Sequence, residues 1–302
     1  MYFLYTKKFL TGCLMASIAA GIGLAVWRTV LMIRYFDPYR NEYAQEARPM
    51  LQTFGLVLFF ALVIIGGAVV LWNCFGLKKE GVAYAPFSAS DDQAATFTSA
   101  LLGFLFLAVG CFLFLSLPLM LMPTVHAVYR YTQLIAFALL FLVAAYFVLN
   151  ATGAPHLARA KKILACVPAL WGVTYLIASY ANPSYLFKDP NHMLCNLALG
   201  ILVLFFVYEG KMSATGRNMG EYLLFALLLI VSAMAYIVPN FILLAYWELS
   251  SELNFLFEAT LIGALIYAIA VAVRLIRSVV PAPKQQKPEK EKNEAPVENG
   301  KA

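Results

Sequence analysis

Runs of apolar residues as long as a lipid bilayer is thick recur through this 302-residue chain, and they constrain its fold more than any other feature. A helix needs about 20 apolar residues, with a range of about 17–25, to cross a hydrocarbon core of about 30 Å. Because a spanning barrel would instead show alternating segments of about ten residues, these runs predict helices. Eight runs are near this length, the sixth being short and the seventh long: 9–27, 51–72, 101–122, 131–149, 163–180, 193–208, 222–247 and 253–273.

Composition excludes a soluble globular fold. Hydrophobic residues make up 62% of the chain and charged residues 13%, against about 45–50% and about 25% in soluble domains. The sequence therefore predicts an all-α polytopic transmembrane helix bundle of about eight spanning helices. Residues 1–280 form its single transmembrane domain. Residues 281–302 have almost no apolar side chains and predict a disordered cytoplasmic tail.

The first run has two interpretations. A basic start at Lys7 and Lys8 followed by small residues is typical of a cleaved signal peptide, and cleavage would leave seven helices with the N-terminus outside. However, the apolar core of a signal peptide runs about 7–15 residues to a small-residue cleavage site. Here the run is longer and ends at Trp27 and Arg28, so we favour a retained helix.

The basic residues predict the orientation. Lys and Arg are enriched on the cytoplasmic side of membrane proteins. With the N-terminus inside, sixteen of the 22 Lys and Arg residues fall in inner segments and six in outer segments. Both termini are therefore predicted to be cytoplasmic in a multi-pass protein of the plasma membrane. The Lys and Arg residues of the inner segments account for the net charge of +6, so no nucleic-acid partner is needed to explain it. The lipid bilayer is the expected partner, with other membrane proteins as further candidates.

Two charged residues lie in or beside apolar runs. Arg28 is placed near the outer interface, where a long Arg side chain can extend its guanidinium to water, and we favour this interpretation. Glu258 is the one acid that the predicted spans place well inside a helix, in the outer leaflet a little below Arg28. Embedded carboxylates are costly and usually face a partner. The sharper hypothesis is therefore an Arg28–Glu258 ion pair that joins the first helix to the last.

Other polar residues share the outer half of the predicted bundle. Pro239 lacks a backbone N–H, which predicts a helix kink and a freed carbonyl group. The polar side chains either line a small cavity open to the outside or join helices to one another. The candidate cluster consists of Ser116, Thr174, Ser179, Asn196 and Asn240.

The inner half of the predicted spans looks dry, meaning that it lacks ionisable side chains in mid-span. No Asp, Glu, His, Lys or Arg lies in the middle of a predicted span there, which argues against an ion-coupled transporter. The sequence has no catalytic motif, and no catalytic, cofactor-binding or metal-binding residue is assigned. The histidines, His126, His156 and His192, fall in predicted loops or at helix ends and are interpreted as solvated. The five cysteines have no metal-site or redox spacing, so no disulfide is expected.

Small residues at four-residue spacing predict close helix packing. The first run carries Ala16 with Ala20 and Ser17 with Gly21, and the last run carries Gly263, Ala264, Ala268 and Ala272.

The stretch VPALWGVTYLIASYANPSYLFKDPNHMLCNLALGILVLFFVYEGKM, with the earlier WRTVLMIRYFDPYRNEY, resembles a group of uncharacterised multi-pass membrane proteins from clostridial-type Gram-positive bacteria. The similarity covers most of the chain, although its motifs are loose. It implies a bacterial plasma membrane and brings no activity and no site residues.

Three functional classes follow from these observations. We favour a non-enzymatic membrane protein that senses, scaffolds or assembles with partners, because the loops are short and the inner half is dry. The alternative is a permease or channel for a small solute that enters from the outer face, which the outer polar cluster favours. An intramembrane enzyme is disfavoured because no acid–base set converges at one depth.

Overall fold

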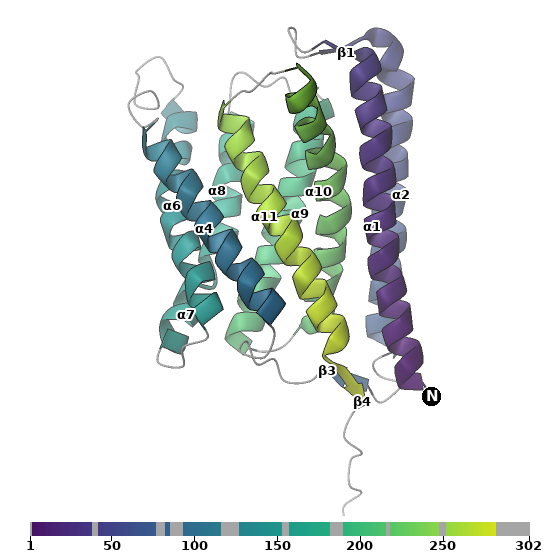
Figure 1. Ribbon diagram of the computed structural model, residues 1–302, viewed down its shortest axis with the longest axis vertical. Coiled ribbons are helices and arrows are strands. Elements are labelled where there is room, and N and C mark those ends of the chain that lie inside the picture. Colours follow the sequence, from purple (N-terminus) through teal and green to yellow (C-terminus); the bar gives the residue numbers. More distant parts are fainter. Residues whose placement is uncertain are drawn as a thin grey trace, which may run out of the picture.

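The computed structural model describes residues 2–37, 42–76, 82–84, 93–115, 127–152, 157–181, 190–215, 218–247 and 252–281. Among these residues, eight helices are long and apolar enough to cross a membrane, as the apolar runs predict. The chain is thus an all-α polytopic bundle (Figure 1). The end of the third predicted span, at 116–122, and the predicted tail beyond residue 281 lie outside the described residues.

Most spans are single helices, and the fifth combines short α7 with α8, which a turn at 165–166 separates. The helices are α1 (Tyr2–Tyr35), α2 (Arg48–Leu71), α4 (Gln93–Leu115), α6 (Ala127–Thr152), α7 (Ala158–Leu164), α8 (Val167–Ala181), α9 (Pro190–Thr215), α10 (Met219–Trp247) and α11 (Glu252–Arg277). Short elements complete the chain: strands β1 (Phe36–Asp37), β2 (Glu42–Tyr43), β3 (Val82–Tyr84) and β4 (Val279–Pro281), the 3₁₀ turn η1 (Gln45–Ala47) and the π-helical turn η2 (Trp72–Gly76).

Several helices extend past the apolar runs that predict them. Helix α9 is the clearest case, because its run covers 193–208 whereas the helix covers Pro190–Thr215. Proline suits the first position of a helix, since its missing N–H would have no intrahelical partner there. A helix that begins at Pro190 and continues past Tyr208 brings Glu209 into the bundle, with consequences described below.

Both ends of the described chain lie at the same end of the bundle, which we call the proximal end, and the opposite end is distal (Figure 1). At the proximal end the Lys7 ammonium donates a hydrogen bond of 3.1 Å to the Arg277 carbonyl oxygen. Strand β3 pairs antiparallel with β4 beside this contact, whereas the β1–β2 hairpin lies at the distal end.

Six of the helices form a closed ring. Each packs against the next in the order α4, α6, α8, α9, α10 and α11, and α11 returns to α4. Helix α1 packs outside this ring against α10 and α11, and α2 covers α1 and α10. Helix α10 therefore has neighbours on several sides, and its span is the most buried of the eight.

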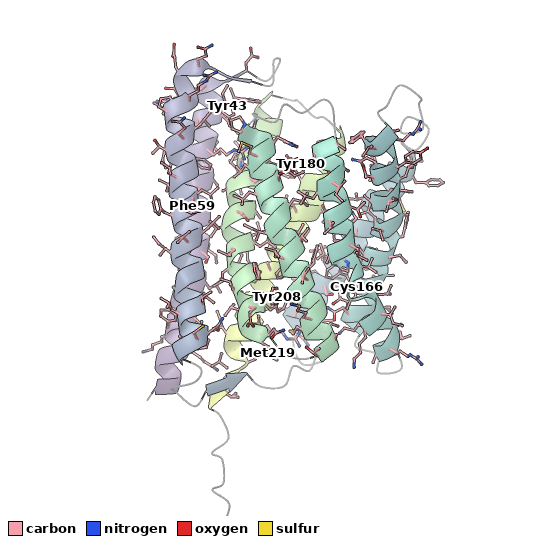
Figure 2. The ribbon with its side chains drawn as sticks, turned by 180° about the vertical axis from the view of Figure 1, so that it is seen from behind. Tyr43, Phe59, Cys166, Tyr180, Tyr208 and Met219 are labelled. Atoms are coloured by element: carbon pink, nitrogen blue, oxygen red, sulfur yellow. The ribbon has the colours of Figure 1, made fainter. Side chains whose placement is uncertain are left out.

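The outer faces of the helices carry large apolar side chains. Phe59 of α2 is 58% exposed and points away from the bundle (Figure 2), and Phe104 of α4 and Leu170 of α8 are similarly exposed on other faces. This distribution suits a lipid environment, because lipid-facing side chains need no polar cover.

The predicted small residues permit close helix contacts at two positions. A Cβ atom added to Gly21 of α1 would lie 2.8 Å from the Met234 sulfur of α10, and one added to Gly263 of α11 would lie 2.6 Å from Leu105 of α4. Ala264, Ala268 and Ala272 are fully buried. Packing through small residues is therefore confirmed in α11 and, in α1, for Ser17 and Gly21, whereas Ala16 of the other predicted pair is exposed.

Candidate functional site

Arg28 is the centre of a buried polar cluster in the distal half of the bundle. Its side chain is only 2% exposed. The Nη1 atom donates to the Ala235 carbonyl oxygen at 3.1 Å and to the Tyr236 carbonyl oxygen at 2.6 Å. The favoured sequence interpretation, in which the guanidinium extends to water, is therefore wrong, because the side chain turns inward to α10.

Pro239 explains why α10 offers the Ala235 carbonyl group. In a regular helix the N–H of residue 239 would donate to the Ala235 carbonyl, but proline has no N–H. Helix α10 nevertheless continues through Pro239 to Trp247. The guanidinium of Arg28 supplies the missing donor, so the freed carbonyl that Pro239 predicts is present and has a partner from α1. The kink itself stays a prediction.

The second guanidinium nitrogen joins α9 and makes a further contact with α10. Nη2 of Arg28 donates to Asn191 Oδ1 at 2.9 Å and to Asn240 Oδ1 at 3.0 Å. The Asn240 amide in turn donates from Nδ2 to Glu258 Oε1 at 2.6 Å. Arg28 and Glu258 thus belong to one cluster, as expected, and Asn240 bridges them; a direct ion pair between them stays a prediction.

Two tyrosines extend this cluster. The Tyr43 hydroxyl of β2 donates to Asn191 Oδ1 at 3.0 Å. The guanidinium carbon of Arg28 lies 5.4 Å from the centre of the Tyr236 ring, close enough for a cation–π contact. We call Arg28, Tyr43, Asn191, Tyr236, Asn240 and Glu258 the distal cluster.

A neighbouring set of hydrogen bonds joins α8 to α9. The Ser179 hydroxyl donates to Asn196 Oδ1 at 2.9 Å, and Asn196 Nδ2 lies 3.0 Å from His192 Nε2. His192 is 6% exposed and contacts the Tyr180 ring, so its interpretation as a solvated loop residue is wrong. These contacts favour helix joining as the role of Ser179 and Asn196.

The predicted outer cluster is brought together only in part. Asn240 belongs to the distal cluster, and Ser179 and Asn196 form the adjoining set. Thr174 donates instead to the Leu170 carbonyl oxygen of its own helix at 2.9 Å. Ser116, His126 and His156 lie outside the described residues.

A second polar cluster surrounds Glu209 in the proximal half. Its side chain is 2% exposed. Oε1 accepts hydrogen bonds from the Tyr146 hydroxyl at 3.0 Å and from the Tyr267 hydroxyl at 2.9 Å, while Oε2 accepts one from the Tyr222 hydroxyl. We call these four residues the proximal cluster. Two predictions are therefore wrong: that Glu258 is the one acid inside a span, and that the inner half of the spans is dry.

The sequence contains a weak signal for Glu209. The residue directly follows an apolar run and precedes Gly210 and Lys211, which is typical of a span that has reached water. Gly210 has a different role, because an added Cβ would lie 2.6 Å from the Ala165 carbonyl oxygen. The α7–α8 turn can therefore approach α9 closely at this point.

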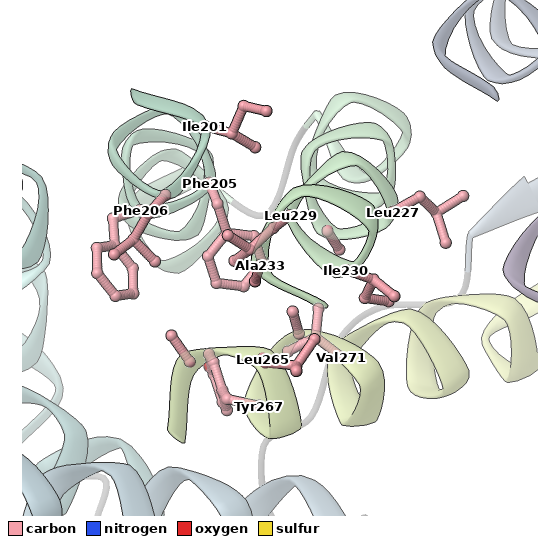
Figure 3. Close-up of a cluster of buried hydrophobic side chains, with 14 of the residues drawn as sticks. Ile201, Phe205, Phe206, Leu227, Leu229, Ile230, Ala233, Leu265, Tyr267 and Val271 are labelled. Carbon is pink, nitrogen blue, oxygen red and sulfur yellow. The ribbon is translucent and has the colours of Figure 1, made fainter. Parts of the chain in front are cut away.

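Packed apolar side chains separate the two clusters. Phe205 of α9, Leu229 and Ala233 of α10, and Leu265 of α11 converge between them (Figure 3), and the first three are fully buried. We call these four residues the apolar layer. Asn191 and Glu209 lie at opposite ends of α9, about 27 Å apart at a helical rise of about 1.5 Å per residue.

The described part of the chain contains neither a candidate metal site nor a disulfide. Within the described residues, no group of three His, Cys, Asp or Glu side chains is placed to hold a metal ion. All five cysteines lie in described segments, and none forms a disulfide.

No known protein family, no curated protein and no solved structure matches the chain. The eight apolar helices make it an integral, multi-pass membrane protein.

Proposed function

We propose that the chain is a non-enzymatic multi-pass protein of a bacterial plasma membrane that assembles with other membrane proteins as a sensing or scaffolding component. The apolar layer is the observation that carries this proposal. A continuous solute path needs polar groups through the middle of the membrane, and an enzyme needs acid–base groups that converge on one substrate position. Packed apolar side chains lie between the two carboxyl groups instead.

The polar clusters support the same role. Arg28 and Glu209 each join several helices by hydrogen bonds, and fully satisfied polar networks make a bundle rigid and specific. The resemblance to multi-pass proteins of clostridial-type bacteria favours a bacterial plasma membrane. The distribution of Lys and Arg favours cytoplasmic termini.

Site-specific photo-crosslinking tests assembly in native membranes. A photoreactive residue is placed singly at Phe59, Phe104 or Leu170, which are exposed on different faces of the bundle. We expect one face to give a discrete protein adduct of constant mass, with no adduct from the other faces or without irradiation. Lipid adducts alone from every face would contradict the proposal.

The alternative function is a permease or channel for a small solute that enters from the distal face. Glu209 favours it, because an ionisable side chain in the proximal half removes the strongest sequence argument against ion-coupled transport. The two clusters also lie toward opposite ends of the same helices, α9 and α10. In this case the apolar layer would be a closed gate.

Reconstitution into liposomes separates the two candidates. Transport predicts solute uptake that the Glu209→Gln variant reduces at least tenfold, together with thermal stabilisation of the purified protein by the transported solute. Assembly predicts no uptake beyond that of empty liposomes and a discrete adduct in the crosslinking experiment.

A further inference from the structure

The proximal cluster places one carboxyl group against three hydroxyl donors. Tyr146 of α6, Tyr222 of α10 and Tyr267 of α11 all donate to Glu209 of α9. An ionised carboxylate has about four lone-pair positions and can accept all three bonds. The arrangement therefore fits the ionised form of Glu209.

The same cluster can also hold the neutral acid. Ser213 Oγ, one turn further along α9, is buried and has no hydrogen-bond partner among the described residues, and it lies beside the Tyr146 hydroxyl. If Glu209 takes up a proton, Tyr146 can turn its hydroxyl from Oε1 to Ser213.

Opposing effects act on the charge of Glu209. Burial among apolar side chains disfavours a charged carboxylate, whereas hydroxyl donors and nearby cations favour it. The cations that act on Glu209 are Lys161 of α7 and Arg274 of α11, both from the proximal side. With the three tyrosines, they are the titratable and charged groups that face Glu209 from the described helices packed around it.

We propose that Glu209 is a proton-binding site that exchanges its proton with water at the proximal end of the bundle. The proton adds to a carboxylate oxygen and gives a neutral acid, and the Tyr146 hydroxyl transfers its hydrogen bond to Ser213. Because the tyrosines come from α6, α10 and α11, proton uptake alters the hydrogen bonds that join four helices. The site is independent of whether the chain assembles with partners or transports a solute.

Infrared spectroscopy of the purified chain in lipid nanodiscs tests the proposal, because the C=O stretch of a neutral carboxylic acid is distinct from the bands of a carboxylate. Spectra are recorded between about pH 5 and about pH 9, which brackets the titration of perturbed carboxyl groups. We expect a titrating acid band that the Glu209→Gln variant lacks and the Glu258→Gln variant keeps. Size-exclusion chromatography checks that each variant is folded.

Two milder variants test the hydrogen-bond exchange, and they decide the question if Glu209→Gln does not fold. Tyr222→Phe removes a donor to the carboxylate, so we expect about tenfold tighter proton binding. Ser213→Ala removes the second acceptor for Tyr146, so we expect about fivefold weaker binding. A band that is absent, that remains without Glu209, or that shifts in neither variant would overturn the proposal.

Discussion

A guanidinium group buried in a membrane protein needs acceptors for its N–H donors, since unsatisfied groups cost several kcal/mol in lipid. Arg28 has four such contacts: two carbonyl oxygens of α10 and the side-chain oxygens of Asn191 and Asn240. Hydrogen bonds to charged groups contribute about 1.5–3 kcal/mol each. Loss of the Arg28 side chain would therefore remove four hydrogen bonds from the described part of the distal half.

The Arg28→Ala variant should lower the free energy of unfolding by about 3–5 kcal/mol, because it leaves carbonyl and amide oxygens unsatisfied and the Glu258 carboxyl without a nearby cation. Unfolding of the purified protein in mixed detergent micelles measures the change. Arg34→Ala is the matched control, because Arg34 is an exposed arginine on the same helix, and its effect should stay within about 0.5 kcal/mol. Equal losses in the two variants would show that the Arg28 contacts do not stabilise the bundle.

At the scale of elements, sequence patterns predict spans well and partners poorly. Length and hydropathy indicate all eight helices, because the bilayer imposes one length on every span. Arg28 and Glu258 stand out as charges among apolar residues. Glu209 does not stand out in the sequence, because an acid at the end of an apolar run looks the same whether it meets water or, as here, tyrosine hydroxyls from three other helices. Thr174 shows a further limit of the pattern, because a threonine can satisfy its hydroxyl group within its own helix, as Thr174 does at Leu170.

The contact between α1 and α10 gives a prediction about Pro239. Restoring a backbone N–H with Pro239→Ala supplies an intrahelical donor to the Ala235 carbonyl, which Arg28 now satisfies. In the Arg28→Ala background, Pro239→Ala should recover about 1–2 kcal/mol of unfolding free energy. In the wild-type background it should give no such gain, because the carbonyl already has a donor. The same micelle titration checks both, and a gain of equal size in both backgrounds would contradict this account.

The same helix pair tests packing through small residues. A Cβ on Gly21 meets Met234 of α10 at 2.8–3.0 Å, whereas one on Gly23 meets nothing within 4 Å. Gly21→Val should therefore cost about 1–3 kcal/mol, as overpacked cores do. Gly23→Val, two residues away and exposed, should remain within about 0.5 kcal/mol of wild type. Comparable destabilisation in both would mean that valine disturbs α1 itself and not its contact with α10.

At the scale of the whole molecule, an even number of spans returns the chain to the side from which it starts. The Lys7–Arg277 hydrogen bond agrees with this, because it joins the first helix to the last at the proximal end. The enrichment of Lys and Arg on the cytoplasmic side then predicts that the proximal end faces the cytoplasm, since the proximal segments carry most of these residues. This orientation predicts which side each polar cluster is nearer: Glu209 would exchange its proton with the cytoplasm, and the distal cluster would lie toward the outside.

Cysteine labelling on intact cells tests this orientation. In a background whose five cysteines are replaced by alanine, Glu46→Cys lies in the distal turn η1 and Ala214→Cys lies near the proximal end of α9, and both positions are exposed. A membrane-impermeant maleimide should label the first variant on intact cells and the second only after permeabilisation. The two variants control each other for thiol reactivity, since both should label fully in permeabilised cells. The reverse pattern would place the termini outside and assign Glu209 to the external solution.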